Sequence, residues 1–160
     1  MIKVGIFMAD GCEEIEGLTV VDIVRRAKLE IETISITEKA EVTSSHQVTF
    51  KPDTTKAQAD FDSYDAIVLP GGMPGTLNLG ADETVVKTIK RFAAEGKKAT
   101  CHPGFEEKLL GAQWLEQPVV VDGNVITSRG MGTAIAFALE LVRYFTDDAT
   151  VEHIRQGLVY

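Results

Sequence analysis

Short apolar runs alternate with apolar stripes at helical spacing along this chain of 160 residues. The runs predict buried strands over residues 2–8 and 64–70, and alternating side chains predict a strand over residues 30–37. The stripes predict helices starting after Asp10, over residues 83–95 and over residues 131–145. Asp147 is expected to cap a last short helix. This alternation of strands and helices predicts an α/β sandwich around a mostly parallel sheet.

Weaker patterns fill the remaining chain. Residues 42–51 are expected to hold one or two short strands, and residues 97–101 another. Asp122-Gly123-Asn124 separates two valine-rich runs and predicts a hairpin. Asp10 stands three residues before Glu13, a spacing typical of a helix cap. Because no repeat or linker interrupts the pattern, residues 1–160 are expected to form a single domain.

Composition excludes several classes of protein. The chain is 44% hydrophobic and 25% charged, as in ordinary globular proteins. Its net charge of −8 argues against nucleic-acid binding. No apolar run approaches the roughly 20 residues that span a bilayer, and the N-terminus resembles a strand and not a signal peptide. The two cysteines, Cys12 and Cys101, indicate no disulfide framework, so a reducing, cytoplasmic setting without membrane partners is expected.

Candidate chemistry lies where the predicted strands end, because ligands of α/β sheets bind at the carboxyl ends of strands. The first group is acidic. A carboxyl that faces a cleft at a helix start can have a raised pKa and relay a proton. Acids also favour the first helical turn, so Glu13 and Glu14 are expected to be solvated there. Glu16 differs because it lies one helical step before the apolar stripe.

Gly71 and Gly72 follow a buried strand and form the second candidate. Two glycines let backbone N–H groups approach a ligand and stabilise an oxyanion, although a plain turn explains them equally simply. They do not match a dinucleotide fingerprint, and no cofactor is expected.

The third candidate is Cys101 beside His102. An imidazole next to a thiol can favour the thiolate and create a nucleophile, but a buried cysteine with a hydrogen-bonded histidine fits the spacing as well. Cys12, near a helix N-terminus, is a lesser candidate. His46 and His153 stand alone and are interpreted as surface or structural residues. No spacing of His, Cys and acidic residues predicts a metal site.

Four segments in order resemble the ThiJ/PfpI superfamily, especially its parkinsonism-associated deglycase branch. They are D-G-C-E-E-I-E (10–16), D-A-I-V-L-P-G-G-M-P-G (65–75), T-C-H-P-G-F-E-E-K-L (100–109) and V-V-V-D-G-N-V-I-T-S-R-G-M-G-T (119–133).

This resemblance implies a flavodoxin-like three-layer sandwich. It also implies a cysteine at a strand-to-helix nucleophile elbow, hydrogen-bonded to a buried protonated glutamate, here Glu16. Gly71 and Gly72 would frame the oxyanion pocket, and His102 would be the nearby loop histidine.

The chain departs from the family pattern at one place. Family members follow the Gly-Lys-rich end of a helix with the elbow strand, another helix and a second Gly-Lys-rich turn. Here Lys98 runs directly into Ala99 and the T-C-H-P-G segment, so about 20 residues, one strand and one helix, have no counterpart. Cys101 therefore remains a candidate on its local chemistry alone. Either the chain is a deletion form, or the natural polymer holds residues between Lys98 and Ala99 that this sequence lacks.

The resemblance implies glyoxalase- or deglycase-type chemistry on small reactive carbonyls such as methylglyoxal. A thiolate would add to the aldehyde, Glu16 would shuttle the proton and the glycine backbone would stabilise the oxyanion. Without the elbow cysteine the chain would be inactive. The resemblance also implies a homodimer in which Arg25 and Arg26 of the first helix would lie near the partner. The alternatives are a non-catalytic stress-response or chaperone-like homodimer and then a cysteine peptidase, for which no convincing triad is present.

Overall fold

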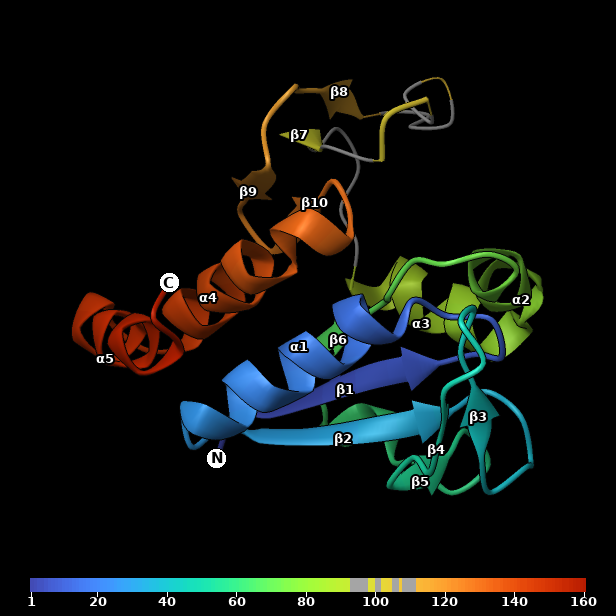
Figure 1. The fold of residues 1–160 in the computed structure, drawn as a ribbon. Coiled ribbons are helices and arrows are strands. Elements are labelled where there is room, and N and C mark those ends of the chain that lie inside the picture. Colours follow the sequence, from blue (N-terminus) through green and yellow to red (C-terminus); the bar gives the residue numbers. More distant parts are fainter. Residues whose placement is uncertain (93–97, 100–101, 105–106, 108–111) are drawn as a thin grey trace.

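Four parallel strands form the centre of the computed structural model, which describes residues 1–92, 98–99, 102–104, 107 and 112–160 (Figure 1). Their order is β5-β2-β1-β6. The strands are β1 (Lys3–Met8), β2 (Glu30–Ser35), β5 (Thr54–Thr55) and β6 (Ala66–Val68). β1 pairs with β2 along its whole length and with β6 from Val4 to Ile6, so the predicted parallel neighbours are confirmed.

Helices cover both faces of this sheet and make three layers. On one face lie α1 (Glu14–Arg26), α4 (Ala134–Phe145) and α5 (Asp148–Leu158), and on the other α2 (Gly75–Ala81) and α3 (Glu83–Phe92). Successive side chains of a strand point to opposite faces. Val4 and Ile6 of β1 therefore join the core under α1 and α4. Phe7 joins the second core with Leu79 and Val85 of α2 and α3. The predicted three-layer α/β sandwich is confirmed.

Small strand pairs and short helices complete the fold. The predicted hairpin is present as β9 (Val119–Asp122) with β10 (Val125–Ser128). The short strands expected over residues 42–51 are β3 (Val42–Thr43) and β4 (Thr49–Phe50), which pair in antiparallel fashion. β7 (Lys98–Ala99) pairs in parallel with β8 (Gln113–Trp114), outside the central sheet. Single 3-10 turns occur at Phe61–Ser63 and Met131–Thr133.

The start of α1 differs from the sequence-based expectation. Glu13, and not Asp10, caps the helix, because its Oε1 accepts the backbone N–H of Ile15 at 3.3 Å. Asp10 Oδ1 instead accepts the backbone N–H of Thr43 at 2.9 Å, a donor in β3 that is far away in the sequence. Asp147 does cap α5, as predicted, by accepting from Thr150 at 2.7 Å.

Among the residues described, none of the helices is both long enough and apolar enough to cross a bilayer.

Candidate functional site

Two loops at the carboxyl ends of β1 and β6 interlock and build the floor of the site. The Glu13 N–H donates to the Gly71 carbonyl at 2.8 Å, and the Gly75 N–H donates to the Gly11 carbonyl at 3.0 Å. Gly72 has a φ of 94°, and a side-chain carbon added there would lie 2.3 Å from the Glu13 nitrogen. The approach of the two loops therefore requires glycine at this position.

Glu16 reaches across from the first turn of α1 to this floor. The Gly71 N–H donates to its Oε2 at 2.6 Å, so the predicted proximity of Glu16 and Gly71 is confirmed. The side chain is half-buried. Burial raises the pKa of Glu16 and the charge of Glu13 adds to this, while the Gly71 hydrogen bond and His102 oppose it. The expected raised pKa is present, and its main cause is desolvation.

His102 lies on the other side of the same carboxyl. A side-chain carbon added at Gly130 would lie 3.4 Å from His102 Cδ2 and 3.7 Å from Glu16 Oε1. Glu16 Oε1, His102 and Gly130 therefore lie close together. His102 Nδ1 lies 3.0 Å from the Pro103 carbonyl, which can only accept, so Nδ1 carries the proton. Sequence reasoning missed Gly130, although its φ of 151° is one that only glycine adopts readily.

Gly71 and Gly72 use different backbone groups in hydrogen bonds. The Gly71 N–H is already engaged by Glu16, so it serves an oxyanion only if that bond is given up. The Gly72 carbonyl accepts from the Thr76 N–H at 2.9 Å and from its hydroxyl at 2.9 Å, at the start of α2. The predicted oxyanion role of Gly71 and Gly72 stays a prediction.

Neither cysteine is shown to be a nucleophile. Cys12 is fully buried, and burial raises the pKa of its thiol to about 11, with Glu14 and Glu13 adding to the shift. The expectation that the helix N-terminus would lower this pKa is wrong, because desolvation outweighs it. At pH 7 only about one Cys12 thiol in 10⁴ is ionised. Cys101 lies outside the described residues, so its role stays a prediction.

The acidic pair at the start of α1 is not solvated as expected. The side chains of Glu13 and Glu14 are only 12% and 11% exposed. The turn between β3 and β4 folds over them, because the Ser45 N–H donates to the Cys12 carbonyl at 2.9 Å. This brings His46 Nδ1 to 3.1 Å from Glu14 and 3.5 Å from Glu13, so His46 does not stand alone.

Arg25 and Arg26, predicted to lie near a partner subunit, interact within their own chain. Arg25 pairs with Asp53 at 3.2 Å and Arg26 with Asp22 at 2.8 Å. Both arginine side chains are about half exposed, so they remain accessible from solution. Their role at an interface stays a prediction.

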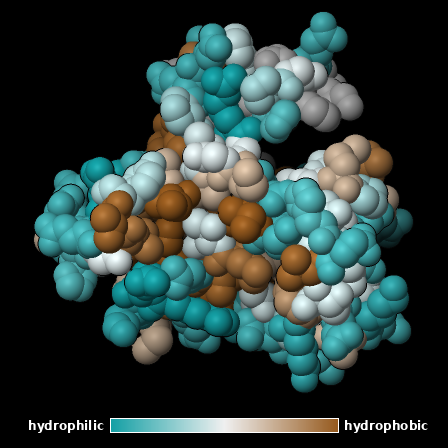
Figure 2. All heavy atoms as spheres, in the orientation of Figure 1, coloured by the Kyte–Doolittle hydropathy of each residue, from teal (hydrophilic) through white to brown (hydrophobic). Residues whose placement is uncertain are grey.

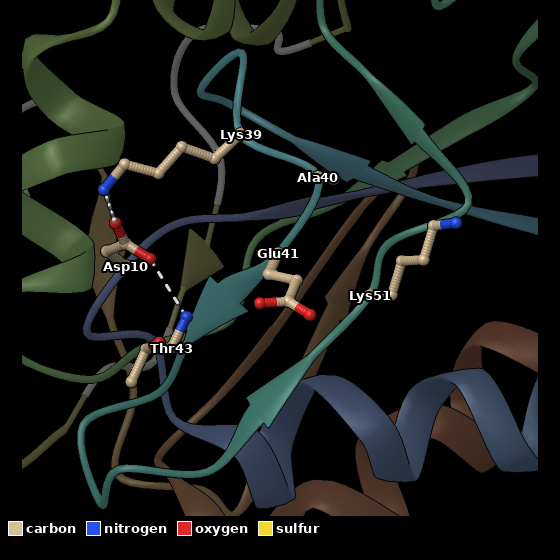
Figure 3. Close-up of a pocket in the computed structure, with 6 residues that line it drawn as sticks. All are labelled: Asp10, Lys39, Ala40, Glu41, Thr43 and Lys51. Atoms are coloured by element: carbon tan, nitrogen blue, oxygen red, sulfur yellow. Dashed lines mark hydrogen bonds and ion pairs between the residues drawn. The ribbon is translucent and has the colours of Figure 1, made fainter.

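A surface hollow of about 500 Å³ lies beside the site and does not include Glu16 (Figure 3). Lys39 points across it toward Asp10, with 3.4 Å between Nζ and Oδ2. Its lining is mostly polar and comes from Asp10, Lys39, Ala40, Glu41, Thr43 and Lys51. We place the chemistry at Glu16 because burial raises the pKa of its carboxyl and because this carboxyl lies close to the imidazole of His102.

The fold and the site define the class of protein: a three-layer α/β sandwich with a half-buried acid at the carboxyl ends of two neighbouring parallel strands. The chain belongs to the DJ-1/PfpI family, whose model matches residues 2–97 and 93–144.

Relatives from several kingdoms support this assignment. Protein dj-1beta of Drosophila melanogaster is 30% identical, with 96% of this chain and 95% of the relative covered. The glutathione-independent glyoxalase DJ-1 of Schizosaccharomyces pombe is 30% identical, with 89% and 90% covered. The chain spans 36% of protein DJ-1 homolog B of Arabidopsis thaliana, which is 35% identical over the matched part.

Solved structures agree with the fold. A mutant of a DJ-1 superfamily protein from Salmonella typhimurium superposes with a TM-score of 0.91 at 30% identity, covering 100% of this chain and 99% of the other. Drosophila DJ-1beta superposes with a TM-score of 0.89 at 29% identity, covering 99% and 97%.

The alignments also bear on the segment that the sequence lacks after Lys98. The family model matches in two pieces that both include residues 93–97. The alignment with the Drosophila relative extends over 177 positions but uses 96% of 160 residues, or about 154, so about 23 positions lack a residue of this chain. Among the described strands, β6 is the last on its side of the sheet. These observations agree with the absence of one strand and one helix.

Proposed function

We propose that this protein binds small α-oxoaldehydes such as methylglyoxal beside Glu16, and that Glu16 carries the proton in their conversion to α-hydroxy acids. The observation that supports this most directly is the Glu16 carboxyl. Its Oε2 accepts the Gly71 N–H at 2.6 Å, its Oε1 lies near Gly130 and His102, and burial raises the pKa of the carboxyl. A carboxyl with a raised pKa exchanges protons more readily near neutral pH.

The chemistry of this conversion suits a site of one acid and one imidazole. One water is added, the aldehyde carbon is oxidised and the adjacent ketone carbon is reduced, so no external oxidant is needed. A proton is removed from the aldehyde carbon, and a proton is added to the neighbouring carbon. Glu16 can accept a proton from the first carbon and deliver one to the second. His102 can donate a hydrogen bond to an oxygen of the substrate. A relative that is 30% identical is a glutathione-independent glyoxalase.

This chain differs from the expected family chemistry in its nucleophile. Cys12 is buried with a thiol pKa of about 11 and is not a competent thiolate. We infer that the elbow cysteine belongs to the segment without a counterpart between Lys98 and Ala99. Turnover by this chain therefore does not depend on Cys101, and it is slow, because loss of a covalent nucleophile costs about 10⁴-fold or more.

Lactate formation from methylglyoxal tests this proposal. A chain that receives a relative's elbow strand and helix between Lys98 and Ala99 should gain activity by orders of magnitude. Glu16→Gln in that extended chain should remove the gain. Absence of any gain in a folded, extended chain would contradict the proposal.

A second candidate function, a non-catalytic homodimer, is favoured by one surface. Apolar side chains gather over α1 and α4 on one face of the molecule (Figure 2). On α1, Ile15 and Leu18 are 48% and 39% exposed, and Val48 of the adjacent β3–β4 turn is 45% exposed. A second copy that covers this face would remove this apolar surface from water. Dimerisation is compatible with the carbonyl chemistry.

A further inference from the structure

Three side chains that could hold a metal ion meet at the start of α1. Glu13 and Glu14 come from the helix start, and His46 comes from the turn between β3 and β4. One ligand atom of each lies within 4.8 Å of the others. His46 Nδ1 is 3.1 Å from Glu14 Oε1 and 3.5 Å from Glu13 Oε2. One imidazole nitrogen therefore faces two carboxylates.

The two carboxylates of this cluster offer oxygen atoms within 4.8 Å of each other. The two carboxylates are largely covered, at 12% and 11% exposure. In the part of the chain that the structure describes, neither of them has a lysine or arginine ion-pair partner, and both pair with His46. Two neighbouring carboxylates with little access to water repel each other, and a bound dication would offset this repulsion.

The spacing of the cluster matches that of a metal coordination sphere. In a tetrahedral zinc site with bonds of about 2.1 Å, neighbouring ligand atoms lie roughly 3.4 Å apart. The two distances from His46 Nδ1, 3.1 Å and 3.5 Å, fall on either side of this value. The two glutamate oxygens lie within 4.8 Å of each other, so they must move closer together to bind one ion.

The backbone holds the cluster together without an ion. The Ser45 N–H donates to the Cys12 carbonyl at 2.9 Å, which fixes the turn against the helix start. The Ser45 hydroxyl donates to Glu13 Oε2 at 3.5 Å, where it can orient this ligand. His46 is 66% exposed, so an ion can enter from solvent.

We propose that Glu13, Glu14 and His46 form a binding site for a divalent transition-metal ion of the zinc type, with water in the remaining coordination position. The imidazole ligand favours zinc over calcium or magnesium, which prefer ligand sets made of oxygen alone. This site is separate from the carbonyl chemistry proposed for Glu16, and neither proposal requires the other.

Isothermal titration of EDTA-treated protein with zinc chloride tests the site. Every protein carries Cys101→Ser, so that this thiol does not compete for zinc. The parent should bind one zinc ion per chain and should not bind calcium under the same conditions. His46→Asn and Glu14→Gln should each weaken zinc binding by about tenfold or more. His153→Asn, which removes an exposed histidine on α5, is the matched control and should bind like the parent.

The unfolding midpoint of each metal-free variant, measured by circular dichroism, separates loss of the site from loss of the fold. If His46→Asn is folded and binds zinc as tightly as the parent, the assignment is wrong. It is equally wrong if the His153→Asn control loses the same affinity, or if the parent binds no zinc.

Discussion

Replacement of Gly72 by alanine should destabilise the fold, because Gly72 lies where the two site loops touch. An added side-chain carbon would lie 2.3 Å from the Glu13 nitrogen, 2.6 Å from the Cys12 carbonyl carbon and 2.8 Å from the Gly11 oxygen. All three are backbone atoms, so no side chain can rotate away. The loops must separate by about 1 Å to restore ordinary contact distances.

The expected cost follows from these contacts. A left-handed conformation costs alanine about 1–2 kcal/mol. Separation of the loops also weakens the Glu13–Gly71 and Gly75–Gly11 hydrogen bonds, each worth about 1 kcal/mol. The reduced entropy of the unfolded chain returns roughly 0.5–1 kcal/mol. The net loss is about 2–4 kcal/mol, a large part of the 5–15 kcal/mol that is typical of a domain.

Urea denaturation, followed by circular dichroism, measures this loss. With a slope of about 2 kcal/mol per molar urea, Gly72→Ala should lower the midpoint by roughly 1–2 M. Gly80→Ala in α2 is the matched control, because nothing lies within 4 Å of a carbon added there. The control should be neutral or stabilise by up to about 1 kcal/mol. A Gly72→Ala protein as stable as the wild type would refute the close packing of the two loops.

Two further predictions concern Glu16 and the apolar face of α1. Because burial raises the pKa of Glu16, the folded protein keeps a proton that the unfolded chain loses as the pH rises above the ordinary carboxyl value of about 4.3. Wild-type stability should therefore fall relative to that of Glu16→Gln as the pH rises through this window in EDTA; a difference that is independent of pH contradicts the raised pKa. If the protein is a homodimer through α1, Leu18→Glu should convert it to monomers, as measured by light scattering. The control Leu77→Glu on α2 should leave the dimer intact. A dimer that survives Leu18→Glu argues against an interface at α1.

The local pattern of the chain predicted most of the fold. Apolar runs predicted β1 and β6, because buried parallel strands carry near-continuous apolar sequence. Alternation of side chains predicted β2. Helix α2 was not predicted, since Gly75–Ala81 contains two glycines and only a short apolar repeat. The cap of α1 was assigned wrongly because Asp10 is used by Thr43, a partner that spacing near the helix cannot reveal.

The candidate site was predictable only in part. Glu16 and Gly71 were expected to meet because the carboxyl ends of neighbouring parallel strands share one edge of the sheet. The cluster of Glu13, Glu14 and His46 was not, because His46 is 32 residues from Glu14 and arrives through the orientation of a hairpin turn. The raised pKa of Cys12 was also missed, since its burial depends on how the two site loops pack.

The rate of lactate formation from methylglyoxal tests the central claim most directly, when wild type, Glu16→Gln and Cys101→Ser are compared in EDTA. The account predicts a slow wild-type rate above the protein-free rate, a Glu16→Gln rate that falls to the protein-free value, and a Cys101→Ser rate equal to that of the wild type. Wild-type activity that survives in Glu16→Gln, or that disappears in Cys101→Ser, would contradict the assignment of Glu16 as the proton carrier of a site that works without Cys101.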